Sequence, residues 1–137
     1  MSYDTENIFA KILREEIPAI KVYEDETTLA FMDIMPQAEG HTLVIPKEPA
    51  TTLLELSDEA ATDLVVTLKK VVTAVKKALN ADGISVFQLN GEAAGQTVPH
   101  IHFHVLPGSI LGARPHASVN SSQEKLMETA ERIKAAF

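Results

Sequence analysis

Three of the five histidines in this 137-residue chain occupy alternate positions, at His100, His102 and His104. Side chains of a β-strand alternate between its two faces, so a strand here would place three imidazoles on one face and apolar side chains on the other. The apolar face can enter a core, but a row of three imidazoles is an unusual packing surface. The spacing therefore indicates a functional site.

The chemistry that best suits this row is nucleophilic catalysis at phosphorus. A neutral imidazole nitrogen is nucleophilic near pH 7, and neighbouring rings can set its tautomer and stabilise charge. The loop before the row supports a phosphate site, because Gly91, Gly95, Gln96 and Thr97 offer backbone amides, a side-chain amide and a hydroxyl.

A metal site is the alternative chemistry for the same histidines. Two histidines at i and i+2 can share one ion, with His41 or His116 as a third ligand. In a strand, however, His100 and His104 would lie about 13 Å apart, and parallel side chains do not converge over that distance. We therefore expect no metal and no other cofactor. A histidine-row metalloprotein stays open as an alternative, and His116 by itself is assigned no role.

The composition limits the classes of protein that the chain can belong to. A net charge of −7 argues against a nucleic-acid partner, whose phosphates require clustered Lys and Arg. The chain has no cysteine, which excludes disulfides and thiolate metal sites and fits a cytoplasmic location. No apolar run approaches the ~18 residues of a membrane span. We expect one soluble domain over residues 1–137.

Short elements punctuated by Pro and Gly must position these groups. We expect helices at residues 6–16, at 58–80 and from near 121, and strands at 20–24, 29–33, 41–46, 84–89 and 100–106. Ser57 suits an N-cap, and Ser121 with Glu124 matches a capping box. The order of elements predicts an α+β fold, with an antiparallel sheet of about five strands, one long helix and one or two shorter helices.

The motif and the segments around it resemble the histidine triad (HIT) superfamily, and most closely its branch of small nucleotide-binding phosphoramidases (Hint-like). The family signature is His-φ-His-φ-His-φ-φ, where φ is apolar, and residues 100–106 reproduce it. Further matching blocks are residues 7–12, 16–19, 29–34, 36–38, 41–47, 90–91 and 95–97. The resemblance covers about residues 5–108, whereas Pro99 and the tail at 109–137 depart from the family pattern. It implies a HIT-like fold whose sheet continues across a homodimer.

The resemblance also implies roles for the histidines and the loop. His102 would be the nucleophile, and its Nδ1–H would donate a hydrogen bond to the backbone carbonyl of His100. His41 would pair with the His100 ring and hold it in place. His104 would lie near the phosphate and leaving group. The remaining residues that the resemblance places at the phosphate are Asn90, Gly95, Gln96 and Thr97.

For the nucleoside, the resemblance implies a ribose contact and an apolar slot. The carboxylate of Asp33 would bind the ribose hydroxyls, although Asp beside Ile34-Met35-Pro36 also suits a turn. The apolar slot around the base would comprise Ile8, Phe9, Ile12, Phe31 and Ile34. Of these, the helical residues also suit a core-facing stripe.

The implied activity is hydrolysis of purine nucleoside 5′-phosphoramidates or acyl-nucleotides, by attack of His102 on the α-phosphorus through a covalent nucleotidyl-histidine. The partner is a purine nucleotide of the AMP or GMP type, and no metal is required. Two alternatives stay open: a dinucleoside polyphosphate hydrolase that uses the same residues, and a nucleotide-binding regulator whose hydrolysis is incidental.

Overall fold

A computed structural model describes residues 2–113 and 122–137 of the chain. Its centre is a five-stranded sheet in the order β1-β2-β3-β5-β4, with every neighbouring pair antiparallel. The helices are α1 (Ile8–Leu13), α2 (Asp58–Leu79) and α3 (Gln123–Ala135), and the strands are β1 (Lys21–Glu24), β2 (Thr28–Met32), β3 (Thr42–Pro46), β4 (Ile84–Gln88) and β5 (Phe103–Pro107). Short 3-10 turns follow β4, at Glu92–Ala94, and β5, at Ile110–Gly112. The predicted α+β class, with one long helix and two shorter ones, is confirmed.

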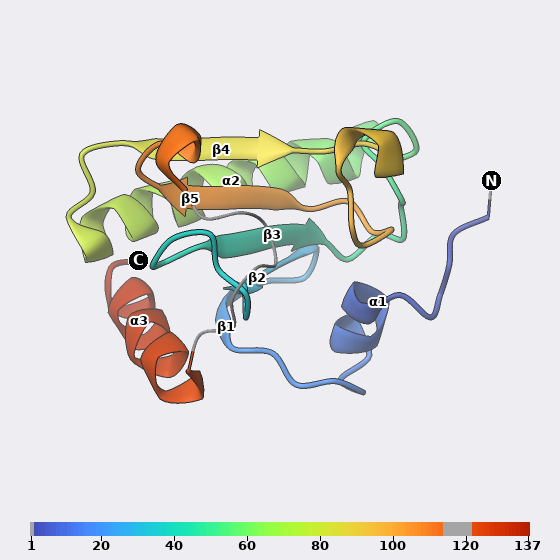
Figure 1. The fold of residues 1–137 in the computed structure, drawn as a ribbon. Coiled ribbons are helices and arrows are strands. Elements are labelled where there is room, and N and C mark those ends of the chain that lie inside the picture. Colours follow the sequence, from blue (N-terminus) through green and yellow to red (C-terminus); the bar gives the residue numbers. More distant parts are fainter. Residues whose placement is uncertain (1, 114–121) are drawn as a thin grey trace.

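Both faces of the central strands are buried, each against different helices. Figure 1 shows α2 along the back of the sheet, where it packs with α3, while α1 lies apart from both near the N-terminus. Even-numbered residues of β2 and β3 join the larger core beneath α2 and α3, namely Ala30, Met32 and Val44. Odd-numbered residues pack with α1, namely Leu29, Phe31, Leu43 and Ile45. This alternation places His41, which precedes β3, on the α1 face of the sheet.

The helix boundaries follow from capping, with two corrections. Ser57 accepts a hydrogen bond from the Ala60 amide, and Asn80 ends α2 in the left-handed conformation. The predicted cap of α3 is wrong, because Ser122 accepts from the Lys125 amide and the helix begins one residue later than expected; Ser121 lies outside the described residues. The first helix, Ile8–Leu13, is shorter than the predicted span of residues 6–16, and Asn7 is its N-cap. Among the described residues, no helix is long and apolar enough to cross a membrane.

The strand that was predicted to carry all three histidines begins only at Phe103, so His100 and His102 precede it. The last ladder pairs join Phe103 to Val44 on one side and to Gln88 on the other. Before this point the backbone turns away, since the His100 amide donates to Val98 O and the Ile101 amide to Ala50 O. A strand needs a partner for its backbone groups, and both neighbouring ladders end here. Three histidines in one strand is therefore the wrong description of the motif.

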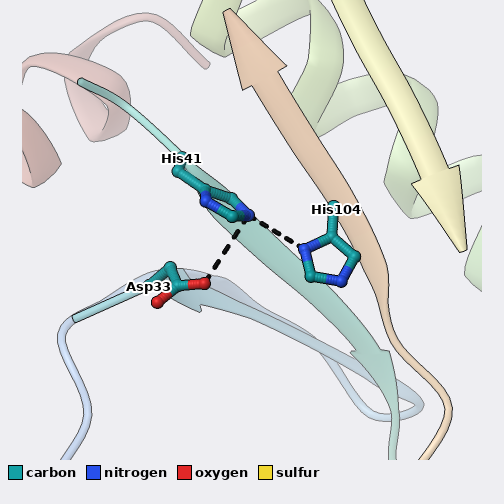
Figure 2. A group of neighbouring side chains, drawn as sticks. All are labelled: Asp33, His41 and His104. Carbon is teal, nitrogen blue, oxygen red and sulfur yellow. Dashed lines mark hydrogen bonds and ion pairs between the residues drawn. The ribbon is translucent and has the colours of Figure 1, made fainter. Parts of the chain in front are cut away.

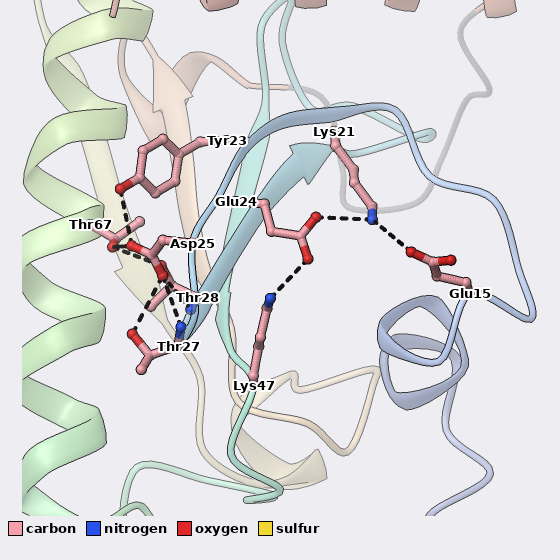
Figure 3. Close-up of polar contacts among 9 residues, drawn as sticks. All are labelled: Glu15, Lys21, Tyr23, Glu24, Asp25, Thr27, Thr28, Lys47 and Thr67. Atoms are coloured by element: carbon pink, nitrogen blue, oxygen red, sulfur yellow. Dashed lines mark hydrogen bonds and ion pairs between the residues drawn. The ribbon is translucent and has the colours of Figure 1, made fainter.

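Asp25 is the polar centre of the turn between β1 and β2 (Figure 3). Its carboxylate accepts hydrogen bonds from the amides of Thr27 and Thr28 at 2.9 and 2.8 Å, from the Thr28 hydroxyl and from the Tyr23 hydroxyl. Partial burial by itself would raise the pKa of Asp25, but the hydrogen bonds lower it from 3.8 to about 2. The ionised carboxylate therefore stabilises the fold.

We expect Asp25→Asn to destabilise the protein at pH 7 by about 1 kcal/mol, a value reduced by solvent screening of a partly exposed group. Because the folded pKa lies below the unfolded one, this stability is present above pH 3.8 and is lost as the pH falls toward 2. The difference between wild type and variant should therefore narrow below pH 4. Denaturant unfolding at pH 7 and in acid measures it, with exposed Glu26→Gln as the control. Equal stability of Asp25→Asn and wild type at pH 7 would contradict the assignment.

Candidate active site

A cavity of about 240 Å³ lies between α1 and the sheet and carries two of the histidines on its wall. Its residues come from α1 and the chain after it, from β2 and its following loop, and from the segment that leads into β5. The lining residues are Ile8, Phe9, Ile12, Ile17, Pro18, Ala19, Phe31, Met32, Asp33, Ile34, Met35, Leu43, Thr97, Val98, His102 and His104. The structure thus brings Asp33, Thr97 and all five residues of the predicted apolar slot together with two of the histidines.

His102 is held in one tautomer by the backbone. Its Nδ1 lies 2.7 Å from the carbonyl oxygen of His100, which can only accept, so the proton sits on Nδ1 and the lone pair on Nε2. The ring is nearly buried, at 5% exposure, and meets the ring of Phe9 edge-to-face with centroids 5.0 Å apart. This tautomer agrees with the expectation from the resemblance, and it suits a nucleophilic Nε2.

His100 faces away from the cavity and is bonded at both ring nitrogens. Its Nε2 donates to the carbonyl of Pro46 at 2.9 Å, and its Nδ1 accepts from the Tyr3 hydroxyl at 2.5 Å. Burial lowers the pKa of His100 to about 4, although the hydrogen bond to Pro46 opposes the shift and the neighbouring His102 adds to it. His100 is therefore neutral at pH 7, and its backbone carbonyl is the part of the residue that contacts another histidine.

The predicted pairing of His41 with His100 is wrong, because His41 pairs with His104 instead. Nε2 of His41 lies 2.9 Å from Nδ1 of His104, and Asp33 Oδ2 lies 3.6 Å from Nε2 of His41 (Figure 2). The sheet register explains the difference. Leu43 of β3 pairs with His104 of β5, so the residue two positions before Leu43 lies diagonally beside His104 on the same face.

Hydrogen bonds decide which ring nitrogen of His41 and of His104 carries the proton. The Gln37 amide donates to Nδ1 of His41 at 3.0 Å, so His41 carries its proton on Nε2. That proton is donated to Nδ1 of His104, which leaves the proton of His104 on Nε2. His104 is also stacked on Phe87, with ring centroids 4.3 Å apart and planes 8° from parallel. The ring is thus fixed with an N–H donor at the cavity wall.

One group among the described residues could offer ligands to a metal ion: Asp33, His41 and His104. The ring nitrogen of His41 that faces the other two is Nε2, yet this nitrogen carries the proton because Nδ1 already accepts from the Gln37 amide. Coordination would require loss of that hydrogen bond or an imidazolate. Asp33, His41 and His104 therefore suit a hydrogen-bonded histidine pair beside a carboxylate better than they suit a metal ion. The expected absence of a metal stays a prediction.

Two of the residues predicted to hold phosphate, Gln96 and Asn90, bond to other groups of the protein in this structure, and the phosphate role of Asn90 stays a prediction. The side-chain amide of Gln96 donates both hydrogens to carbonyls of Thr51 and Val98, and its oxygen accepts from the Gly91 amide. The expected donation from Gln96 to a phosphate is therefore wrong for this arrangement. Asn90 Oδ1 accepts from the Leu53 amide and from Gln88. These bonds fix the loop whose Gly95, at a φ of +102°, and Thr97 lead to the cavity.

Several contributors to the site were not predicted. Leu43 lies two residues after His41, so strand alternation was a usable signal for it. The sequence offered no signal for Tyr3 or Phe87, since the histidine rings that they contact lie far away in the sequence. His116 lies outside the described residues.

Comparisons with known proteins point to one family. A family model described as the HIT domain matches residues 14–110. An adenosine 5′-monophosphoramidase from Schizosaccharomyces pombe is 46% identical over 100 residues, which are 73% of this chain and 72% of the relative. The structure of a HIT-like protein from Bartonella henselae, described as involved in cell-cycle regulation, is 47% identical and superimposes with a TM-score of 0.93 over 100% of both chains. A zinc-bound histidine triad family protein from Mycobacterium smegmatis is 33% identical, with a TM-score of 0.82 over 96% of this chain and 93% of the other.

Proposed function

The chain belongs to the HIT domain family, and we propose that it hydrolyses purine nucleoside 5′-phosphoramidates or acyl-nucleotides through a nucleotidyl intermediate on His102. One observation carries the proposal. At the wall of an apolar cavity, the His100 carbonyl holds the Nδ1 proton of His102 and leaves the lone pair on Nε2. Family relatives named as adenosine 5′-monophosphoramidases support the class of substrate.

In the first step, Nε2 of His102 attacks the α-phosphorus as the P–N or P–O bond to the leaving group breaks. The hydrogen bond from Nδ1 to the His100 carbonyl stabilises the imidazolium that this produces. Water then attacks the same phosphorus and displaces the histidine. The hydroxyl of this water stays on the nucleoside 5′-monophosphate, and its remaining proton goes to the solvent. The solvent supplies the proton that a departing amine takes up in the first step, whereas a departing carboxylate leaves without one.

His104 supplies a donor to the reacting phosphate. Its protonated Nε2 suits a hydrogen bond to a phosphoryl oxygen, on which charge is concentrated in the transition state. The hydrogen bond from the Gln37 amide fixes the tautomer of His41, so the pair presents a fixed N–H donor to the phosphate. The role of this pair is electrostatic.

The nucleoside binds in the apolar part of the cavity. Phe9, Phe31 and Ile12 offer flat apolar contact to a base, and Asp33 lies at the edge of the cavity near the histidines. One oxygen of Asp33 accepts from the Met35 amide at 2.8 Å, which orients the carboxylate toward the ribose hydroxyls. The absence of nucleic-acid partners and the cytoplasmic location stay predictions from the composition.

Turnover of a substrate series tests the proposed activity. We expect adenosine 5′-phosphoramidate and an acyl-adenylate to be hydrolysed with kcat/KM at least about tenfold above that for a diadenosine polyphosphate, which has a larger leaving group. Activity should be unchanged after dialysis against EDTA, because the proposed steps use ring nitrogens alone. Faster turnover of the diadenosine polyphosphate would favour the alternative hydrolase. Loss of activity on chelation, with metal bound in stoichiometric amount, would favour the metalloprotein.

We also propose that the protein is a homodimer with a sheet that continues across two copies. Strand β4 is an edge of the sheet, so one side of its backbone has no strand neighbour among the described residues. Val86 on this strand is 42% exposed, and Val65 and Val66 on α2 are about half exposed. A second copy that adds its own β4 would cover the edge.

Sedimentation equilibrium tests this assembly. We expect the mass of two chains for the wild type and of one chain for Val86→Asp, because a buried charge at the strand edge opposes pairing. Met127→Asp, at an exposed apolar position on α3, is the matched control and should remain dimeric. A monomeric wild type would refute the proposal, as would an unchanged mass for Val86→Asp.

A further inference from the structure

The N-terminal segment before α1 reaches the back of the histidine motif through one side chain. The Tyr3 hydroxyl donates to Nδ1 of His100 at 2.5 Å, and the two rings meet edge-on with centroids 5.6 Å apart. The contact spans 97 positions in the sequence. Tyr3 is not among the residues that line the cavity, and its contact with the histidine motif is made through His100.

His100 connects this contact to the nucleophile, because its carbonyl oxygen accepts the Nδ1 proton of His102. The direction of that carbonyl depends on how firmly residue 100 is held. Its amide is bonded to Val98 O, its Nε2 to Pro46 O and its Nδ1 to Tyr3. Val98 lies two residues before His100, and Pro46 ends β3, the neighbour of β5 in the sheet. Tyr3 is the one of these three contacts that comes from the segment before α1.

The segment that carries Tyr3 is itself anchored. The Asn7 side chain donates to Asp4 O at 2.7 Å and also caps α1 by accepting from the Ala10 amide. Arg14 donates to Thr5 O at 2.7 Å. Burial raises the pKa of the Tyr3 phenol above 10.0, against a smaller opposing effect of a hydrogen bond with Asn7, so the hydroxyl keeps its proton through the physiological range.

We propose that Tyr3 is a positioning residue for the nucleophile: its hydroxyl holds the His100 ring, and His100 in turn directs its carbonyl at Nδ1 of His102. This inference rests on the proposed function. With the hydroxyl removed, Nδ1 of His100 loses its donor, and residue 100 keeps only the hydrogen bonds of its amide, its Nε2 and its carbonyl. The His102 ring then spends less time with Nε2 aimed into the cavity. Binding of the nucleotide is unaffected, because Tyr3 is not part of the cavity wall.

Steady-state kinetics of Tyr3→Phe test the proposal. The phenylalanine ring keeps the edge-on contact with His100 and removes only the hydroxyl. We expect kcat for adenosine 5′-phosphoramidate to fall about five- to tenfold, in line with loss of one hydrogen bond, while KM changes less than about twofold. The chain contains two tyrosines, so Tyr23→Phe, whose hydroxyl donates to Asp25, is a matched control with the same chemical change. It should lower stability and leave kcat unchanged.

A second readout does not depend on turnover. ¹⁵N spectra of the histidine rings report which nitrogen carries the proton and whether a nitrogen accepts a hydrogen bond. In Tyr3→Phe, the Nδ1 resonance of His100 should move toward the value of an imidazole nitrogen without a donor, and the Nδ1–H share of His102 should fall. Tyr23→Phe should show the wild-type spectrum.

The outcomes separate the two proposals. An inactive wild type would defeat the proposed function, and the spectra would then decide the role of Tyr3. An active wild type with unchanged kcat in Tyr3→Phe overturns the positioning role, as does a change in KM alone. Unchanged histidine spectra in Tyr3→Phe overturn it as well.

Discussion

Replacement of His102 by alanine is expected to lower kcat for adenosine 5′-phosphoramidate by about a thousandfold or more, while the protein still binds AMP. The substitution removes the only ring whose lone pair the His100 carbonyl assigns to Nε2 at the cavity wall. His104 cannot replace it, since its Nδ1 accepts from His41 and its Nε2 carries the proton. Without a nucleophile the phosphorus can be attacked only by water.

Intact-protein mass spectrometry measures the intermediate directly. After rapid quenching without acid, the wild type should carry an adenylyl group that peptide mapping assigns to residue 102, and neither His102→Ala nor His102→Gly should carry it. Turnover that persists in His102→Ala would defeat the assignment of the nucleophile. A His102→Ala protein that lacks hydrolysis but restores function in cells would favour the nucleotide-binding regulator.

The second large effect is expected at the buried histidine pair. His41→Ala should lower kcat about a hundredfold, because His104 loses the donor that keeps its own proton on Nε2 and the phosphate loses a fixed hydrogen bond. His104→Ala should cause a loss of similar size, since it removes that hydrogen bond outright. The affinity for AMP should change much less than kcat.

A double-mutant cycle distinguishes a coupled pair from two separate contributors. If His41 acts only through His104, the double variant should be no slower than the slower single variant, and the two losses should not add. Multiplication of the two losses would show that His41 has an independent role. Stopped-flow measurement of the first turnover would assign the effect to formation of the adenylyl-histidine, the step at which charge on the phosphate is greatest.

Much of the fold follows from local patterns in the chain. Short apolar runs predicted β2 and β3, and Ser57 with the acidic first turn predicted the start of α2. These features depend on a residue and its near neighbours in the chain, so they can be predicted from the sequence. The position of His102 beside the carbonyl of His100 is equally local, because it joins residues two apart.

Contacts between distant segments could not be predicted in this way. The motif leaves the sheet at Phe103 because its ladder with β3 and its ladder with β4 both end there, a fact about the neighbouring strands that residues 100–106 do not contain. The register of β3 against β5 decided that His41 meets His104. Gln96 binds the backbone at residue 51 because the folded loop brings the carbonyl within reach.

The sequence by itself thus indicated which residues we propose to carry the chemistry, because residue type and spacing along one short segment predicted a site and the family resemblance implied a nucleophile within it. Only the tertiary structure decided how the protons are placed on His41, His100 and His104, whereas His102 takes its tautomer from the carbonyl two residues before it. A neutral imidazole takes its tautomer from whatever donor or acceptor faces each nitrogen. Those partners are Tyr3, Gln37, His41 and Pro46, and each lies more than 50 positions from the ring whose proton it helps to place, except for Gln37 beside His41.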